Sequence, residues 1–185
     1  MAFASNSSKA KKLGREALFE YAVRALGRRA HTERELRLKL ERRAAKESDV
    51  AATIERLRGL DYLDDERTAE SYARSRKDLE SLGRRRVLSD LRRRGVDQET
   101  AERTVEETYR EADELGLIRD YLKRRMGRRL DERIEDPKEV SKLYRALLRA
   151  GFSSGRIGEA LRKIAADSEW LDGLEEESAE ADAAD

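Results

Sequence analysis

Three stretches of this chain carry the same spacing of apolar and small residues. In each stretch, five positions are separated by 4, 4, 6 and 4 residues. The three sets are Leu36, Leu40, Ala44, Val50 and Ile54; Val87, Leu91, Gly95, Ala101 and Val105; and Leu143, Leu147, Gly151, Ile157 and Leu161. Positions four residues apart share one face of a helix, and a small residue is typical of a helix end. The pattern therefore predicts a pair of successive helices that the chain repeats three times.

A further helix is predicted before each pair. Tyr21 and Tyr72 stand fifteen positions before the first members of the first two sets, and Tyr121 stands seven positions further back from the third. The third unit therefore has a longer loop, around residues 130–136. We predict three-helix repeats at residues 14–63, 64–112 and 113–166, with a flexible N-terminal segment at 1–13 and an acidic C-terminal tail at 167–185.

The composition favours helices throughout. Charged residues make up 44% of the chain and aromatic residues only 5%, whereas strands favour β-branched and aromatic side chains. A β-rich fold is nearly excluded. A unit of about 50 residues buries little surface alone, so neighbouring units must share apolar faces. We expect an all-α fold of three tandem three-helix repeats that form a curved, elongated array.

Local signals for helix starts and ends agree with this scheme. Asp136 followed by Pro137 and then Glu139 is typical of a helix start. Thr32 with Glu35 forms a capping-box pattern. Further candidate N-caps are Ser48, Asp64, Asp97 and Ser153, and the candidate helix ends are Gly95 and Gly151.

The formal net charge of +1 hides a strong asymmetry. Residues 167–185 contain nine acidic side chains and no basic ones, so residues 1–166 carry 41 basic and 31 acidic side chains, a net of +10. A basic body favours a polyanionic partner, and the tail either competes with that partner or only solubilises the chain. Trp170, Leu171 and Leu174 interrupt the tail and could dock a short helix on the body or on a partner.

Catalytic chemistry has few candidate residues. The chain has no cysteine, which excludes a disulfide framework, a cysteine-based zinc site and a cysteine nucleophile. The single histidine, His31, stands just before a helix cap, where a structural role is expected. The run from Asp64 to Glu66 lacks the spacing of a calcium loop and fits a helix start instead. We expect no enzyme, no catalytic residue, no cofactor and no metal.

Neither a targeting peptide nor a membrane span is expected. The first residues lack an apolar core of signal-peptide length, and no stretch approaches the ~20 apolar residues that cross a membrane. We expect a soluble, cytoplasmic chain.

Two basic clusters are the candidate binding surfaces. At 100° per residue, the first cluster points away from Val87 and Leu91, and Asp90 is the one acidic residue on that helix. The candidate residues are Arg85, Arg86, Arg92 and Arg93 in the first cluster, and Lys123, Arg124 and Arg128 in the second. They indicate contact with a polyanion or an acidic partner. The alternative is a solvated face whose charge is balanced by nearby carboxylates.

Several segments resemble the RecX family of recombination regulators. They are Arg29–Leu40, which contains a His-Thr pair; Leu60–Ala69, which contains Tyr-Leu-Asp-Asp-Glu, followed by Tyr72; and Gly83–Val87 followed by Leu91 and Arg94–Val96. The resemblance runs from about Arg15 to Ala165. Thr68 stands where the family usually has an aromatic residue and Ala44 where it usually has glycine, and the acidic tail is not part of the family pattern.

The resemblance implies a fold and a function. The fold would be three tandem three-helix units, in agreement with the repeat. The function would be binding of the RecA recombinase filament on DNA, in its helical groove, with restraint of strand exchange and the coupled activities. From the basic clusters we expect only weak contact with DNA itself, through its backbone, and we expect a monomer. The alternatives are a general nucleic-acid-binding helical-repeat protein without a recombinase partner and, third, a scaffold for acidic proteins.

Overall fold

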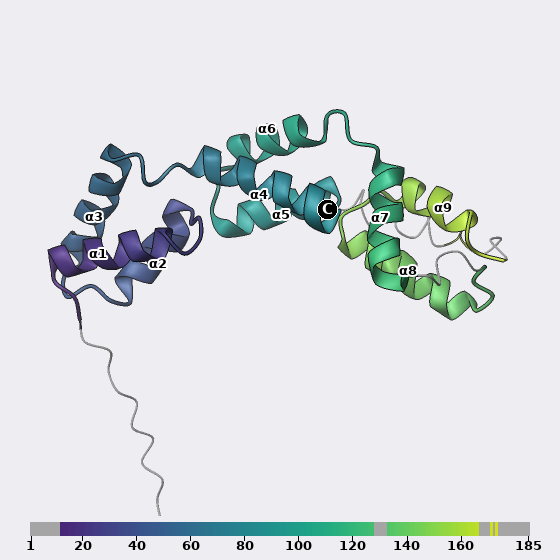
Figure 1. Cartoon of the computed structure of the whole chain (residues 1–185), viewed down its shortest axis with the longest axis horizontal. Coiled ribbons are helices and arrows are strands. Elements are labelled where there is room, and N and C mark those ends of the chain that lie inside the picture. The colour runs from purple at the N-terminus through teal and green to yellow at the C-terminus, as the bar shows by residue number, and fades with distance from the viewer. Residues whose placement is uncertain (1–11, 128–132, 167–170, 172, 174–185) are drawn as a thin grey trace, which may run out of the picture. The chain divides into compact units, whose positions relative to one another are not determined.

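The computed structural model describes residues 12–127, 133–166, 171 and 173, and this part of the chain is helical (Figure 1). The helices within it are α1 (Arg15–Leu26), α2 (Glu33–Glu41), α3 (Glu47–Gly59), α4 (Asp65–Glu80), α5 (Arg84–Arg94), α6 (Gln98–Tyr109), α7 (Glu114–Met126), α8 (Pro137–Arg149) and α9 (Ser154–Arg162). Over the described residues the only β-type pairings are two isolated bridges. The predicted all-α fold is confirmed.

The repeated spacing marks the core. Every position of the three sets is buried except Gly95, which is half-buried. The first and second positions of each set lie on α2, α5 and α8, and the fourth and fifth lie on α3, α6 and α9. A chain of short amphipathic helices therefore buries the same positions three times, as the repeat predicts.

Contacts divide the described residues into two compact units. One holds residues 12–68 together with Arg94–Val96. In it, α1, α2 and α3 pack on one another around an apolar cluster that includes Leu18, Leu36, Leu40 and Ile54, none of which is exposed.

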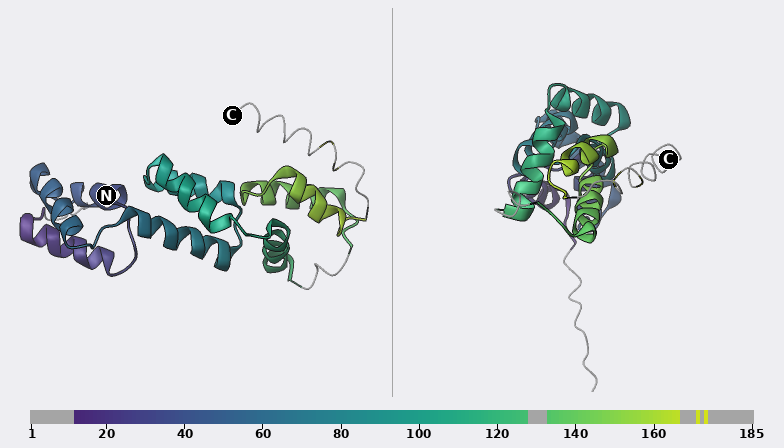
Figure 2. Two further views of the ribbon diagram at one scale, coloured as in Figure 1. Left: turned by 90° about the horizontal axis from the view of Figure 1, so that it is seen from above. Right: turned by 90° about the vertical axis from the view of Figure 1, so that its right-hand side faces the viewer.

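The other unit holds residues 69–93 and the described residues from Asp97 onward. In it, α9 lies against both α7 and α8 (Figure 2). These helices enclose an apolar cluster that includes Ile118, Leu147 and Phe152. The rings of Tyr121 and Phe152 meet edge to face in it, with centroids 6.1 Å apart. Leu171, from the predicted acidic tail, is fully buried in the same cluster, so docking is confirmed at this residue. Trp170 and Leu174 lie outside the described residues.

Most predicted helix caps are present. Thr32 and Glu35 form the capping box on α2. Asp97 accepts from the amide of Thr100 at 3.0 Å, and Asp136 accepts from the amide of Lys138 at 2.9 Å. Asp64 accepts from the amide of Arg67 at 2.9 Å. Ser48 is not a cap, because α3 already begins at Glu47.

Helix ends meet helix starts inside each unit. In the second unit, the amide of Gly83 donates to the carbonyl of Ala150 at 2.8 Å, and the amide of Arg85 donates to that of Gly151 at 3.3 Å. The free carbonyls at the end of α8 thus pair with free amides at the start of α5. In the first unit, the Thr32 hydroxyl donates to the carbonyl of Arg94 at 2.6 Å.

Glycine makes these close approaches possible. Gly95 and Gly151 have φ of +90° and +89°, a conformation that side chains disfavour. A Cβ on Gly151 would lie 2.2 Å from the backbone nitrogen of Arg86, and one on Gly95 would lie 2.2 Å from Cδ of Arg34. The glycines therefore both end a helix and admit the next element.

Ala44, at the corresponding end of α2, has a different neighbour. The amide of Leu13 donates to the carbonyl of Arg43 at 2.7 Å, and the amide of Ala45 donates to that of Leu13 at 2.8 Å. An extended segment covers this helix end, and Ala44 does not have the positive φ of the two glycines. Alanine is therefore tolerated where the family usually has glycine.

Candidate partner interface

Helix α5 presents the first predicted cluster to solvent. Its buried face consists of Val87, Asp90 and Leu91. The four predicted side chains, Arg85, Arg86, Arg92 and Arg93, are all exposed. The wheel therefore gives the direction of these side chains correctly, while their contact with a partner stays a prediction.

Asp90 gives two of these arginines a structural role. It is 4% exposed, and its carboxylate accepts from Arg86 Nε at 3.1 Å and from Arg93 Nη2 at 2.5 Å. The hydroxyl of Tyr72 on α4 donates to the same carboxylate at 3.1 Å. A buried carboxylate needs such partners. Arg86 and Arg93 therefore neutralise a charge inside the unit.

Arg92 is paired by a residue of another helix. Its Nη2 lies 2.5 Å from Oε1 of Glu102 on α6. The wheel considers one helix at a time, so it leaves this carboxylate out. Arg92 therefore fits the alternative interpretation, in which a solvated face is balanced by nearby carboxylates.

The members of the second predicted cluster have different surroundings. Lys123 is exposed. Arg124 Nη1 donates to the carbonyl of Leu79, in the last turn of α4, at 2.9 Å, and so caps that helix end. Arg128 lies outside the described residues. Among the described members, Lys123 is the one without such a structural bond.

Two of the segments that resemble the RecX family, the Tyr-Leu-Asp-Asp-Glu segment and the His-Thr pair, lie near the start of α2. The Asp65 carboxylate accepts from the amide of Glu33 at 2.8 Å and so caps α2, while burial raises the pKa of Asp65. His31 is 3% exposed, and its Nδ1 lies 2.9 Å from the carbonyl of Arg29. Desolvation lowers the pKa of His31. Its Nε2 has no hydrogen-bond partner in the described part of the chain.

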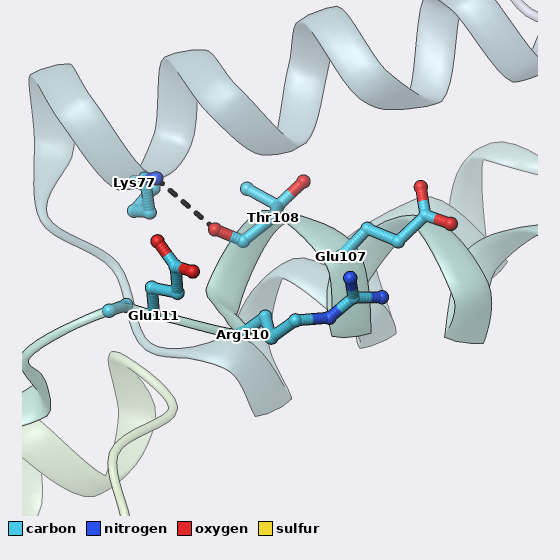
Figure 3. Close-up of a pocket in the computed structure, with 6 residues that line it drawn as sticks. Lys77, Glu107, Thr108, Arg110 and Glu111 are labelled. Carbon is cyan, nitrogen blue, oxygen red and sulfur yellow. Dashed lines mark hydrogen bonds between the residues drawn. The ribbon is translucent and has the colours of Figure 1, made fainter.

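Two surface hollows lie among the described residues. One, of about 490 Å³, is lined by Lys77, Glu107, Thr108, Arg110, Glu111 and Ala112 (Figure 3). Lys77 points to the end of α6 and donates to the carbonyl of Thr108 at 3.1 Å. The other, of about 340 Å³, lies between α7 and α9. Within the described residues no group of acidic or histidine side chains could hold a metal, and no helix is long and apolar enough to cross a membrane.

A third basic group was missed from the sequence. Lys138, Lys142, Arg145 and Arg149 are all exposed on α8. Their separations of 4, 3 and 4 residues place them on one face of a helix. This spacing was the available signal, but adjacent arginine runs are more conspicuous in the sequence than isolated basic residues one turn apart.

Comparison with known proteins gives one consistent family. Residues 19–57 match the description "RecX, first three-helix domain" and residues 64–105 match "RecX, second three-helix domain". The chain is 36% identical over 154 residues to the regulatory protein RecX of Deinococcus radiodurans, covering 82% of this chain and 70% of that protein. It is 30% identical to that of Amycolatopsis mediterranei over 148 residues, covering 78% and 83%.

Solved structures give the same fold. The crystal structure of RecX from Lactobacillus salivarius aligns with a TM-score of 0.63 at 22% identity, over 80% of this chain and 95% of that one. A second structure, of a regulatory protein RecX, also aligns with a TM-score of 0.63, at 21% identity, over 80% of this chain and 71% of that one.

Proposed function

The chain belongs to the RecX family of regulatory proteins, and on this premise we propose that it binds the RecA recombinase filament on DNA. Bound there, it restrains strand exchange and the ATP hydrolysis that accompanies it. It acts in the cytoplasm, as a monomer, without a cofactor or a catalytic residue of its own. The observation that carries this proposal is the family membership.

The architecture supports a binding role. Tandem helical repeats are a fold type whose surfaces commonly bind partners. Several helices present basic side chains to solvent. A chain of this kind is suited to lie along a polymer such as a filament, rather than to enclose a small substrate.

A binding measurement tests the proposal. RecA is assembled on a labelled single-stranded oligonucleotide with a slowly hydrolysed ATP analogue, and binding of the full chain to this filament is compared with binding to the bare oligonucleotide. We expect tighter binding to the filament, with a weaker dependence on salt than for bare DNA. Equal affinities would contradict the proposal.

The second candidate function is general nucleic-acid binding without a recombinase partner. The exposed basic side chains on α8 favour it, because cations on one helix face suit a phosphate backbone. It predicts tight binding to bare DNA that weakens steeply with salt, and no preference for the filament. The same titration therefore separates the two candidates.

A further inference from the structure

We propose that Lys138, Lys142, Arg145 and Arg149 on α8, named here the α8 stripe, bind the phosphate backbone of a nucleic acid. The inference rests on the proposed function only in that it assigns the contact with DNA to a place on the chain. It moves that contact away from the arginines of α5, which the sequence favoured.

The four side chains form a continuous line. At 100° per residue they fall within an arc of about 60°, and eleven residues of helix place the first and last about 16 Å apart along the axis. All four are exposed. The opposite face of α8 is buried through Val140, Leu143, Tyr144 and Leu147, so the helix cannot rotate the stripe inward without losing the core of its unit.

The stripe lacks the carboxylates that balance basic side chains elsewhere. Within the described residues none of its four members forms an ion pair. Pairs on other helices include Arg56 with Glu16 at 3.1 Å, Arg92 with Glu102 at 2.5 Å, and Arg156 with Glu159 at 2.8 Å. Residues 1–166 carry ten more basic than acidic side chains, so some cations on this part of the chain are left without a carboxylate. Four such cations lie in line on one face of α8, and we assign their balancing charge to a partner.

The end of α8 is held against the start of α5. Arg86 Nη1 donates to the carbonyl of Arg149 at 3.4 Å, and the amide of Arg85 donates to that of Gly151. These bonds hold the end of α8, and with it Arg149, against the start of α5. Because Arg86 is paired with Asp90, the phosphate contacts are assigned to the stripe alone.

The chemistry of the stripe favours phosphates over bases. Reading of adenine needs an asparagine or glutamine side chain at the base edge, and base stacking needs exposed aromatic rings. The aromatic ring of α8, Tyr144, is 1% exposed, and the helix contains no asparagine or glutamine. One DNA strand carries a phosphate about every 3.4 Å of helix axis, so a stripe of about 16 Å spans roughly five phosphates.

The salt dependence of DNA binding tests the proposal. Affinity of the full chain for a duplex oligonucleotide is measured between 50 and 200 mM salt for the wild type and for a variant with Lys138→Gln, Lys142→Gln, Arg145→Gln and Arg149→Gln. Each phosphate contact contributes about 0.9 to the slope of log affinity against log salt. We therefore expect the variant to bind more weakly and its slope to fall by about 3.6.

A matched control separates position from net charge. It carries Arg24→Gln, Arg58→Gln, Arg156→Gln and Lys163→Gln, which remove the same charge from exposed side chains that form ion pairs. We expect its slope to stay close to that of the wild type. Circular dichroism checks that both variants keep the wild-type helix content.

Three results would overturn the proposal: an unchanged slope in the α8 variant, an equal fall in the control, or loss of binding to an acidic protein partner with bare-DNA binding intact. The proposed function is tested separately, by measuring whether the wild type inhibits RecA. A wild type that fails to inhibit RecA but shows the predicted change of slope contradicts the proposed function and supports the α8 stripe.

Discussion

The buried carboxylate of Asp90 accepts hydrogen bonds from two exposed arginines of α5. A carboxylate at 4% exposure is stabilised by Arg86, Arg93 and the Tyr72 hydroxyl. From the sequence, Asp90 was one acid among arginines, and its burial could not be deduced because the α4 residue that reaches it is 18 positions away. The run of arginines on α5 therefore serves the fold at two positions.

Removing Arg86 and Arg93 together should destabilise the protein. The double variant to alanine leaves a buried charge without its cations, which costs about 3–5 kcal/mol in a fully buried pair; exposure of the two guanidinium groups reduces this to about 2 kcal/mol. Urea unfolding measures the change. Adding Asp90→Asn to the double variant should restore most of the stability, and no restoration would contradict the assigned role.

His31 should make stability depend on pH. Burial lowers its pKa from the ordinary 6.5, so the folded state binds the proton less readily than the unfolded state. The stability that this contributes is complete above pH 6.5 and is lost as the pH falls below it. Urea midpoints at pH 7.5 and 5.0 should differ more for the wild type than for His31→Gln.

Glu35 also has a shifted pKa, but it does not contribute to the change in stability between pH 7.5 and 5.0. Burial alone would raise the pKa of Glu35, but hydrogen bonds from Arg94 and Arg29 hold it below its usual 4.5. Its contribution is therefore lost only at lower pH, outside the range from 7.5 to 5.0. Equal losses in the wild type and His31→Gln would show that His31 does not titrate on unfolding.

At the scale of elements, the meeting of helix ends gives a prediction for Gly151. Gly151→Ala places a Cβ 2.2 Å from the backbone nitrogen of Arg86 at a φ of +89°. Strain of this kind costs about 1–3 kcal/mol, before any displacement of α5. Thermal unfolding should show a clear decrease in Tm.

Gly155→Ala is the matched control. Gly155 lies in the first turn of α9, where an added Cβ meets nothing within 4 Å. Alanine favours helix over glycine by up to about 1 kcal/mol, so Tm should stay the same or increase. A Tm of Gly151→Ala as high as that of this control would contradict the close approach.

The elements themselves were largely predictable. Apolar periodicity and caps such as Thr32 and Asp136 are local signals, and the structure confirms them. Contacts between distant segments were not predictable: the bond from Arg124 to the end of α4 and the ion pair of Arg92 with Glu102 depend on packing between helices. The predicted direction of all four α5 arginines was thus correct, but the carboxylates that pair with Arg86, Arg92 and Arg93 were not predicted.

At the scale of the whole molecule, the asymmetric charge predicts an effect of the tail. Removal of residues 174–185 deletes acidic groups but keeps Leu171, which is buried. If the tail competes for the basic surfaces, this truncation should increase affinity for DNA or the filament at low salt. Unchanged affinity would mean that the tail is only solvated charge.

The cut after Ala166 provides the comparison. It also removes Leu171, and loss of a fully buried leucine costs on the order of 2–3 kcal/mol. We expect this shorter chain to unfold at lower temperature than the one that ends at Gly173. A gain of affinity seen only in the shorter chain would indicate a disturbed core rather than a removed competitor.

The sequence pointed to a polyanionic partner but could not place the contact. Net charge by segment is a sum, and the sum is the same whether a cation is paired or free. The structure adds the pairing: Arg92 is balanced by Glu102, while the α8 stripe has no such partner in the described residues. This difference is the basis on which the contact is proposed for α8. The tandem helical units were predictable because the same spacing of apolar residues occurs three times along the chain.

The central claim is that the chain regulates a recombinase filament. The most direct test measures ATP hydrolysis by RecA on single-stranded DNA while the full chain is added at less than one molecule per RecA. The account predicts a progressive decrease in hydrolysis at a chain concentration too low to occupy the bare DNA. Hydrolysis that stays constant until the added chain saturates the DNA would contradict it.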